Sequence, residues 1–159
     1  IKYIYSLRRI LKVYLIVGLG NPEEEYSNTR HNIGFDTINA IARKNGIEIN
    51  KNKYNSLCGQ GIIKNEKVIL VKPQTYMNLS GIAVKKFRDF YKIEGKNIIV
   101  IHDDIDIKIG TIKIRKTGGA GTHNGMKSVV QELGNKDFYR IRIGVRKSRR
   151  TKRFKRFCT

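Results

Sequence analysis

Short apolar runs alternate with segments of helical periodicity along most of this chain, and this alternation restricts the fold more than any other feature. The runs 14–19 and 98–101 carry no charge, as expected of strands that are buried on both faces. The segments 33–45, 80–95 and 124–133 place apolar residues at helical spacing. Strands that alternate with helices in this way predict an α/β fold around a mainly parallel sheet.

The ends of the predicted elements follow from single residues. Gly46 and Gly134 are expected to end the first and last helices, while Ser80 is expected to cap the middle helix, which closes at Gly95. Strands are predicted at 56–63 and 67–71, joined by a short polar turn, and at 112–115 and 140–145, where apolar and cationic residues alternate. The sequence therefore predicts a single-domain three-layer sandwich, a twisted, mixed but mostly parallel sheet with helices on both faces.

The charge of the chain is concentrated at its two ends. Among 159 residues, 33 Lys and Arg stand against 13 Asp and Glu, a net charge of +20. Residues 1–12 hold four basic residues and residues 146–159 hold eight, with no acidic residue in either segment. This charge favours a cytoplasmic protein that faces nucleic acid. No apolar run reaches the length of a membrane span, and two cysteines exclude a disulfide framework.

Three polar clusters follow predicted strands, where ligands gather in parallel α/β sheets. They are Asn21 with Thr29-Arg30-His31-Asn32, then His102-Asp103-Asp104, and then the glycine-rich segment 118–125 with His123 and Asn124. Each cluster alone is typical of a surface loop or a helix cap. Together they offer a histidine base, a carboxylate to orient it, and amides that can hold a carbonyl group or a water. Hydrolysis of an ester by an activated water requires such a set.

Other chemistries fit the sequence less well. Gly18-Leu19-Gly20 begins a dinucleotide-binding pattern, but position 23 is Glu23, whose carboxylate would repel a pyrophosphate. The chain has no H-E-x-x-H, no paired C-x-x-C and no G-x-S-x-G motif. We therefore expect no metal ion, no cofactor and no nucleophilic serine or cysteine.

Six motifs resemble those of the bacterial peptidyl-tRNA hydrolase family. In chain order they are YLIVGLGNP at 14–22, TRHNIG at 29–34, KPQTYMNLSG at 72–81, HDD at 102–104, THNG at 122–125 and FYRIRIG at 138–144. The resemblance covers residues 13–145. It implies a metal-independent hydrolase that cleaves the ester between a peptide and tRNA and releases tRNA for reuse in translation.

The resemblance also implies roles for individual residues. His31 corresponds to the base that activates water, Asp103 to the carboxylate that favours the basic form of this histidine, and Asn21 to the residue that distinguishes blocked from free aminoacyl groups. The other implied residues bind substrate: Tyr26, Tyr76, Met77, Asn78, His123 and Asn124 line the site, and Lys113, Arg115 and Arg140 lie on the tRNA-facing surface, with Arg142 a weaker candidate. The implied partner is the acceptor stem and 3′ end of peptidyl-tRNA, bound by a monomer, with no DNA or membrane partner.

Two departures from the family pattern leave the function open. Glu23 and Thr122 stand where the family has glycine, and a β-branched residue such as Thr122 resists a positive φ. If position 122 requires that conformation, activity should fall. Three functions therefore remain: an active hydrolase, a tRNA-binding remnant with impaired catalysis, and a generic basic nucleic-acid binder.

The two basic ends are predicted to lie outside the catalytic domain of residues 13–145. Residues 1–12 begin with Ile1 and are expected to be a non-native upstream extension. Residues 146–159 form a basic tail unlike the family, so the chain is expected to be truncated at its C-terminus. A one-base shift of the reading frame after about residue 145 would give a less basic sequence that resembles the family segment. A frameshift product and a genuine basic tail therefore both remain open.

Overall fold

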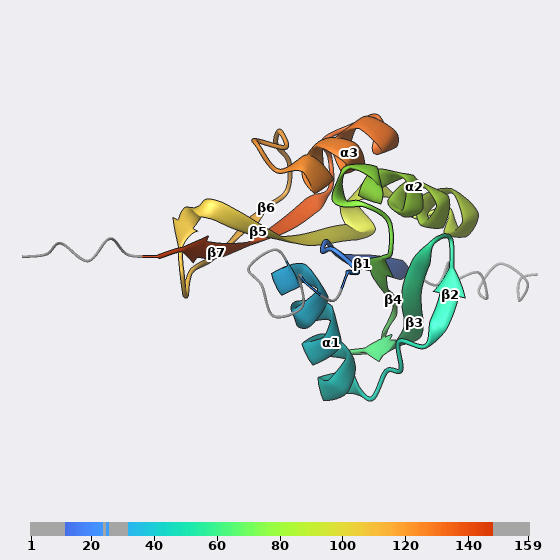
Figure 1. Cartoon of the computed structure of the whole chain (residues 1–159). Coiled ribbons are helices and arrows are strands. Elements are labelled where there is room, and N and C mark those ends of the chain that lie inside the picture. The colour runs from blue at the N-terminus through green and yellow to red at the C-terminus, as the bar shows by residue number, and fades with distance from the viewer. Residues whose placement is uncertain (1–11, 24, 26–31, 148–159) are drawn as a thin grey trace, which may run out of the picture.

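The computed structural model describes residues 12–23, 25 and 32–147, and within these residues one mixed sheet of seven strands runs through the molecule (Figure 1). The strands are β1 (Val13–Gly18), β2 (Lys51–Lys53), β3 (Ser56–Ile63), β4 (Glu66–Pro73), β5 (Ile98–Lys108), β6 (Ile112–Arg115) and β7 (Tyr139–Arg146). The helices are α1 (Ile33–Asn45), α2 (Ser80–Tyr91) and α3 (Asn124–Leu133), with 3-10 turns η3 (Met77–Leu79) and η4 (Gly95–Asn97).

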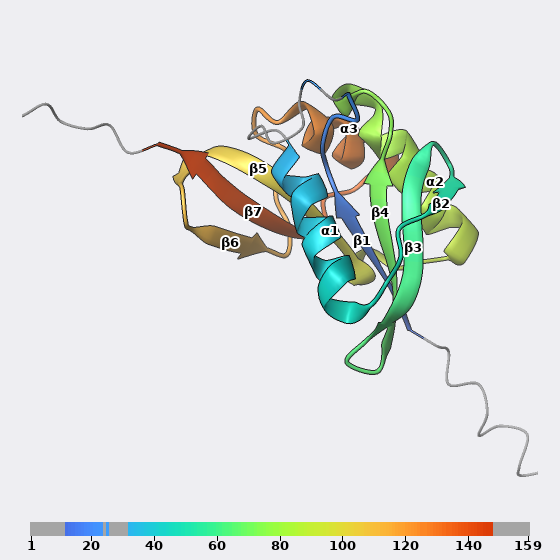
Figure 2. The ribbon, with the colours of Figure 1, turned by 60° about the horizontal axis from the view of Figure 1, so that its bottom comes forward.

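The sheet has the order β2-β3-β4-β1-β5-β7-β6. The central strands β4, β1, β5 and β7 are parallel, whereas β2, β3 and β6 pair antiparallel with their neighbours. Helix α1 covers one face of the sheet, and α2 and α3 cover the other (Figure 1; Figure 2). The predicted three-layer α/β sandwich is confirmed.

Each face of the sheet packs against its helices through a separate apolar cluster. On the α1 face the cluster contains Ile38, Ala42, Ile47, Val68, Leu70 and Ile101, and on the other face it includes Leu15, Val17, Val84, Phe87, Val100, Met126 and Val129. All of these side chains are buried. Because both clusters lie against β1 and its neighbours, the centre of the sheet is the most deeply buried part of the described molecule.

Two glycines bring α1 unusually close to the end of β1. A Cβ atom at Gly18 would lie 2.2 Å from the backbone oxygen of Gly34, and one at Gly34 would lie 2.2 Å from the backbone oxygen of Leu19. No side chain fits at these distances, so the two backbones can meet only because both residues are glycine. Gly18 and Gly34 therefore serve close packing of helix on strand, and this contact brings the start of α1 to the carboxyl edge of the sheet.

Some predicted element boundaries are wrong. Ser80 is the first residue of α2 rather than its cap, and its hydroxyl donates to the Met77 carbonyl oxygen at 2.8 Å. The helix ends at Tyr91, four residues before Gly95, because Lys92 takes the left-handed conformation that terminates it. Strand β5 continues through the predicted polar cluster to Lys108. The short strand β2 was not predicted, since its sequence Lys-Asn-Lys lacks apolar residues.

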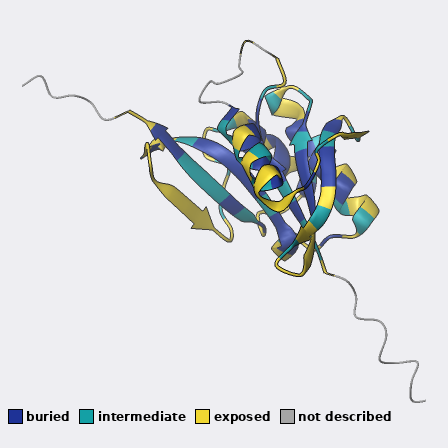
Figure 3. Ribbon diagram, turned by 90° about the horizontal axis from the view of Figure 1, so that it is seen from below, coloured by how far each residue is buried: buried dark blue, intermediate teal, exposed yellow. Residues whose placement is uncertain are grey.

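The outer strand β6 has an apolar face that the described residues leave exposed. Ile112 is 61% exposed and Ile114 is 67% exposed, and Figure 3 shows the whole strand as exposed. Among the strands that the structure describes, β6 pairs only with β7 and lies at the edge of the sheet. Among the described helices, none is long and apolar enough to cross a membrane.

Candidate active site

A pocket of about 470 Å³ opens beside the carboxyl end of β5. Its walls come from β5, β6 and β7, from η3, and from the loop that precedes α3. The lining residues are Met77, His102, Asp103, Asp104, Ile105, Asp106, Arg115, Gly119, Ala120, Gly121, Thr122, His123, Asn124, Arg140 and Arg142. Two of the three polar clusters predicted from the sequence thus meet in one cavity.

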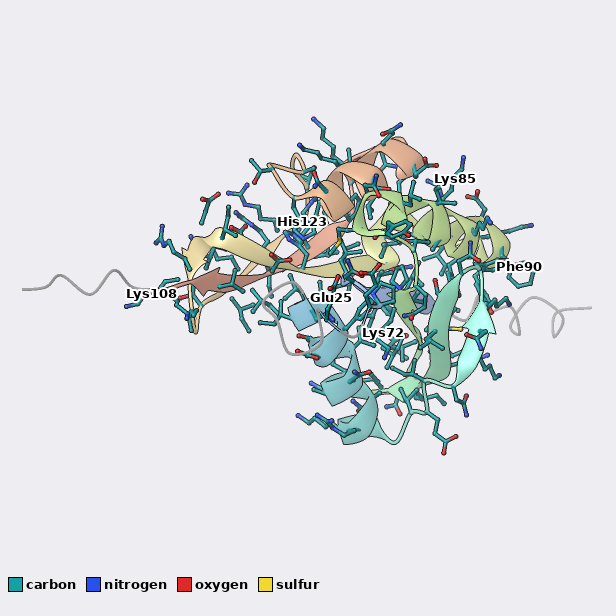
Figure 4. The ribbon with its side chains drawn as sticks, viewed as in Figure 1. Glu25, Lys72, Lys85, Phe90, Lys108 and His123 are labelled. Carbon is teal, nitrogen blue, oxygen red and sulfur yellow. The ribbon has the colours of Figure 1, made fainter. Side chains whose placement is uncertain are left out.

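His123 joins the start of α3 to the carboxylate of Asp103, and Figure 4 places it between α3 and the sheet. The imidazole Nδ1 accepts the backbone N–H of Met126 at 3.2 Å and thereby caps α3. The Nε2 atom donates to Asp103 Oδ1 at 2.9 Å. Because an N–H can only donate and a carboxylate can only accept, these two bonds define a neutral imidazole with its proton on Nε2. His123 therefore lines the pocket as a neutral group.

A second histidine, His102, is buried beside the first. It is 5% exposed, and its ring stands edge-on to the His123 ring with centroids 4.8 Å apart. Its Nδ1 donates to the backbone oxygen of Asp103 at 2.7 Å. Burial lowers the pKa of His102 to about 4, and His123 acts in the same direction. His102 is thus neutral at physiological pH, and the sequence had placed it in a polar cluster without giving it a role.

An ion pair between Asp104 and Arg142 lies on the same wall. Arg142 Nε donates to Asp104 Oδ2 at 2.7 Å, and Asp104 Oδ1 accepts the backbone N–H of Asp106 at 2.8 Å. Burial alone would raise the pKa of Asp104, but the Asp106 amide and the Arg142 guanidinium outweigh it and hold the pKa below its usual value. The Asp104 carboxylate is therefore engaged by a cation.

Asn21 lies at the end of β1, where the buried Asn32 holds its backbone from both sides. The Asn32 side chain accepts the Asn21 N–H at 2.7 Å and donates to the Asn21 carbonyl oxygen at 3.0 Å. The Asn21 side chain in turn accepts the backbone N–H of Glu23 at 3.2 Å. Asn32 was not predicted to have this role, although an asparagine between a turn and a helix is a common partner for loop backbone.

The other predicted residues, apart from the arginines, fall into three groups. Met77 and Asn124 line the pocket. Tyr76 is exposed just before η3, Asn78 is exposed within η3, and Lys113 is exposed on β6. These three residues do not line the pocket. Both Tyr26 and His31 lie outside the described residues.

The two predicted arginines differ in their surroundings. Arg115 is exposed on β6. Arg140, which was expected on the same surface, is only 2% exposed. Its guanidinium donates to the carbonyl oxygens of Lys136, Phe138 and Gly118, so the surface placement of Arg140 is wrong. Backbone carbonyls compensate this charge, a pattern that the sequence does not reveal.

The structure answers the question raised by Thr122. The positive φ angles of the glycine-rich loop belong to Gly118, at 141°, and Gly121, at 59°, whereas Thr122 has none. A β-branched side chain is therefore compatible with position 122. In the part of the chain that the structure describes, no three His, Cys, Asp or Glu side chains group closely enough to hold a metal ion.

Comparisons with known proteins agree with this geometry. A model of the family described as peptidyl-tRNA hydrolase matches residues 15–158. A peptidyl-tRNA hydrolase of Alkaliphilus metalliredigens is 56% identical over 133 residues, which are 84% of this chain and 72% of that protein. One from Clostridium perfringens is 54% identical over 131 residues, 82% of this chain and 70% of that protein.

Solved structures give the same result. The crystal structure of peptidyl-tRNA hydrolase from Acinetobacter baumannii superposes with a TM-score of 0.82 at 40% sequence identity. The match covers 89% of this chain and 72% of that one. Similarity therefore extends through both the sequence and the fold.

Proposed function

The chain belongs to the peptidyl-tRNA hydrolase family, and on this premise we propose that it hydrolyses the ester bond between a peptide and tRNA. The observation that carries the proposal is the pocket in which Asp103, His123 and Asn124 meet. A carboxylate, a neutral imidazole and an amide there can hold an ester and a water without a metal ion.

In the proposed reaction, His31 is the general base. It takes a proton from water while the water oxygen attacks the carbonyl carbon of the ester. The tetrahedral intermediate then collapses, the bond to the 3′ oxygen of the tRNA breaks, and that oxygen takes up a proton. The products are a peptide with a free carboxyl group and a tRNA with a free 3′ end. His31 is the sequence neighbour of Asn32, which is bonded to the backbone of Asn21.

Several residues are proposed to hold the substrate around this base. Asp103 favours the basic, correctly oriented form of His31. Asn21 distinguishes blocked from free aminoacyl groups, and the support for this role is the rigid attachment of its backbone to Asn32. Asn124 can donate an amide N–H to a carbonyl oxygen. His123 is neutral, and its hydrogen bond to the Met126 N–H fixes its orientation. The other proposed substrate contacts are Tyr26, Tyr76, Met77 and Asn78.

We infer that the RNA lies over the β6 side of the pocket. Lys113 and Arg115 are exposed there, and cations on one strand can bind successive phosphates. The proposed ligand is the acceptor stem with the 3′ end, which must reach the pocket for the ester to be cleaved. A monomer in the cytoplasm, where peptidyl-tRNA arises, would carry out this reaction.

The test is release of tRNA from an N-acylated aminoacyl-tRNA in the presence of EDTA. We expect turnover by the unaltered chain, its loss in His31→Ala, and full activity in the control Asn50→Ala, which changes an exposed asparagine before β2. If the unaltered chain is folded and as inactive as His31→Ala, the tRNA-binding remnant replaces the hydrolase as the function. Preference for tRNA acceptor ends over arbitrary RNA then separates that remnant from a generic basic RNA binder.

A further inference from the structure

Arg115 and Arg140 are direct partners across the β6–β7 ladder, yet only one of them is accessible. Arg115 is exposed, whereas Arg140 ranks among the largest fully buried side chains of the described residues. A phosphate can therefore reach the first guanidinium but not the second without a rearrangement. The two arginines of this cross-strand pair therefore cannot both contact phosphate in the structure described.

The guanidinium of Arg140 connects the residues just before β7 to the glycine-rich segment. Its Nη1 donates to the carbonyl oxygen of Lys136 at 3.1 Å and to that of Phe138 at 3.0 Å, and its Nη2 donates to the carbonyl oxygen of Gly118. The guanidinium carbon also lies 4.1 Å from the centroid of the Phe138 ring. A planar fork of donors can make such divergent bonds at once, which a single ammonium cannot reproduce.

The segment held at Gly118 makes few other hydrogen bonds to the rest of the described chain. Within the described chain, two hydrogen bonds tie residues 117–122 to other segments, namely Arg140 to Gly118 and the Thr117 hydroxyl to Asp137 Oδ1 at 3.3 Å. Ala120 packs against the apolar cluster on the α2 and α3 face, whereas a Cβ built at Gly119 or Gly121 would meet nothing within 4 Å. The same segment forms a wall of the pocket and leads directly into His123.

We propose that Arg140 is a positioning residue that holds the glycine-rich wall of the pocket in place, and that Arg115 alone of this pair contacts tRNA phosphate. The effect on catalysis rests on the proposed hydrolase function, whereas the effect on the loop does not. Loss of the Arg140 fork releases residues 117–122, and a pocket wall that moves by about 1 Å can reduce turnover by up to about 100-fold.

The first arm of the test measures the loop itself in the full chain. We expect the 15N order parameters of the Gly118, Gly119 and Gly121 amides to fall below about 0.6 in Arg140→Met and to recover in part in Arg140→Lys. The matched control Arg115→Met removes the cross-strand partner, and it should leave these order parameters unchanged. Thr117→Val, which removes the second tether without altering the core, should lower them by less.

The second arm separates positioning from RNA contact. For Arg140→Met we expect kcat to fall about 10- to 100-fold, with KM and the salt dependence of deacylated tRNA binding unchanged. For Arg115→Met we expect weaker binding and a slope of log K against log salt reduced by about 0.7 to 0.9, the release of one phosphate contact. If Arg140→Met is too unstable for kinetics, Arg140→Lys serves in its place.

Two results would overturn the proposal. One is a reduced salt slope in Arg140→Met with an ordered loop, which would make Arg140 a phosphate contact after all. The other is an unchanged loop with unchanged kcat. Should the unaltered chain fail to hydrolyse N-acylated aminoacyl-tRNA, the proposed function fails, and the order parameters still decide whether Arg140 holds the loop.

Discussion

Three isoleucines form one row across the sheet, and their surroundings differ completely. Ile101 on β5 pairs in register with Ile141 on β7, which pairs with Ile114 on β6. Ile101 is 0% exposed, Ile141 is half-buried, and Ile114 is 67% exposed. The central strands have a helix on each face, whereas the outer ribbon of β7 and β6 extends beyond α1 (Figure 2). Alternation along a strand tells which residues share a face, but not whether anything covers that face.

The largest effect should come from shortening the buried member of this row. We expect Ile101→Ala to lower the free energy of unfolding by about 2 to 5 kcal/mol, because it leaves a cavity between α1 and the sheet. Ile114→Ala, the control in the outer ribbon, should cost less than about 1 kcal/mol. Urea unfolding measures both losses, provided that the slope of the unfolding free energy against urea concentration is the same in the two variants. Equal losses would mean that the outer ribbon is covered in solution.

A pH-dependent effect is expected from His102, which is buried within β5. The pKa of His102 falls from about 6.5 in the unfolded chain to about 4 in the folded one. Between these two pH values the unfolded chain binds a proton at this histidine and the folded chain does not. Stability should therefore decrease as the pH falls, by about 2 kcal/mol between pH 7 and pH 5. The difference in pH slope between the unaltered chain and His102→Gln isolates this contribution. Parallel curves for the two proteins would refute it.

A smaller loss is expected at the cap of α3. His123→Ala removes the acceptor for the Met126 N–H, and we expect it to destabilise the chain by about 1 kcal/mol. The neighbouring substitution Asn124→Ala, on an exposed side chain that is not the cap, is the control for stability. Chemical denaturation measures the loss of stability in both variants. A greater loss in Asn124→Ala would mean that His123 is not the cap of α3.

The smallest effect should come from polar substitution in the outer ribbon. Ile112→Thr and Ile114→Thr keep β-branched side chains on an exposed strand, so we expect each to change the stability by less than about 0.5 kcal/mol. We expect both substitutions to raise the solubility of the chain, because an exposed apolar edge strand favours association between copies. Sedimentation at increasing concentration measures this, and a loss of stability above 1 kcal/mol would place these side chains in a core.

Sequence patterns predicted the elements whose ends have a local cause. Helices α1 and α3 end as expected because Gly46 and Gly134 adopt the left-handed conformation that stops a helix. The end of α2 was wrong, since Lys92 adopts that conformation at a position where no glycine marks it. Strand β2 exists through its pairing with β3, and a Lys-Asn-Lys segment carries no sign of such pairing.

The candidate site was predictable to the extent that its residues belong to contiguous motifs. Asp103, His123 and Asn124 meet in the pocket as the motifs indicated. The burial of Arg140 was not predictable, because charged residues are normally exposed and its partners are backbone carbonyls, which every sequence contains. The role of His102 was missed for a related reason, since its low pKa arises from tertiary packing.

The placement of β1 at the centre of the sheet has a consequence for synthesis on the ribosome. This strand emerges first, but its two neighbours are β4 and β5, and Leu15 meets its partner Ile98 only after some 80 further residues have been made. At about 5 to 20 residues per second, the apolar strand waits on the order of 4 to 16 s for that partner. Nascent chains of this protein should therefore depend on chaperone protection until β5 is complete.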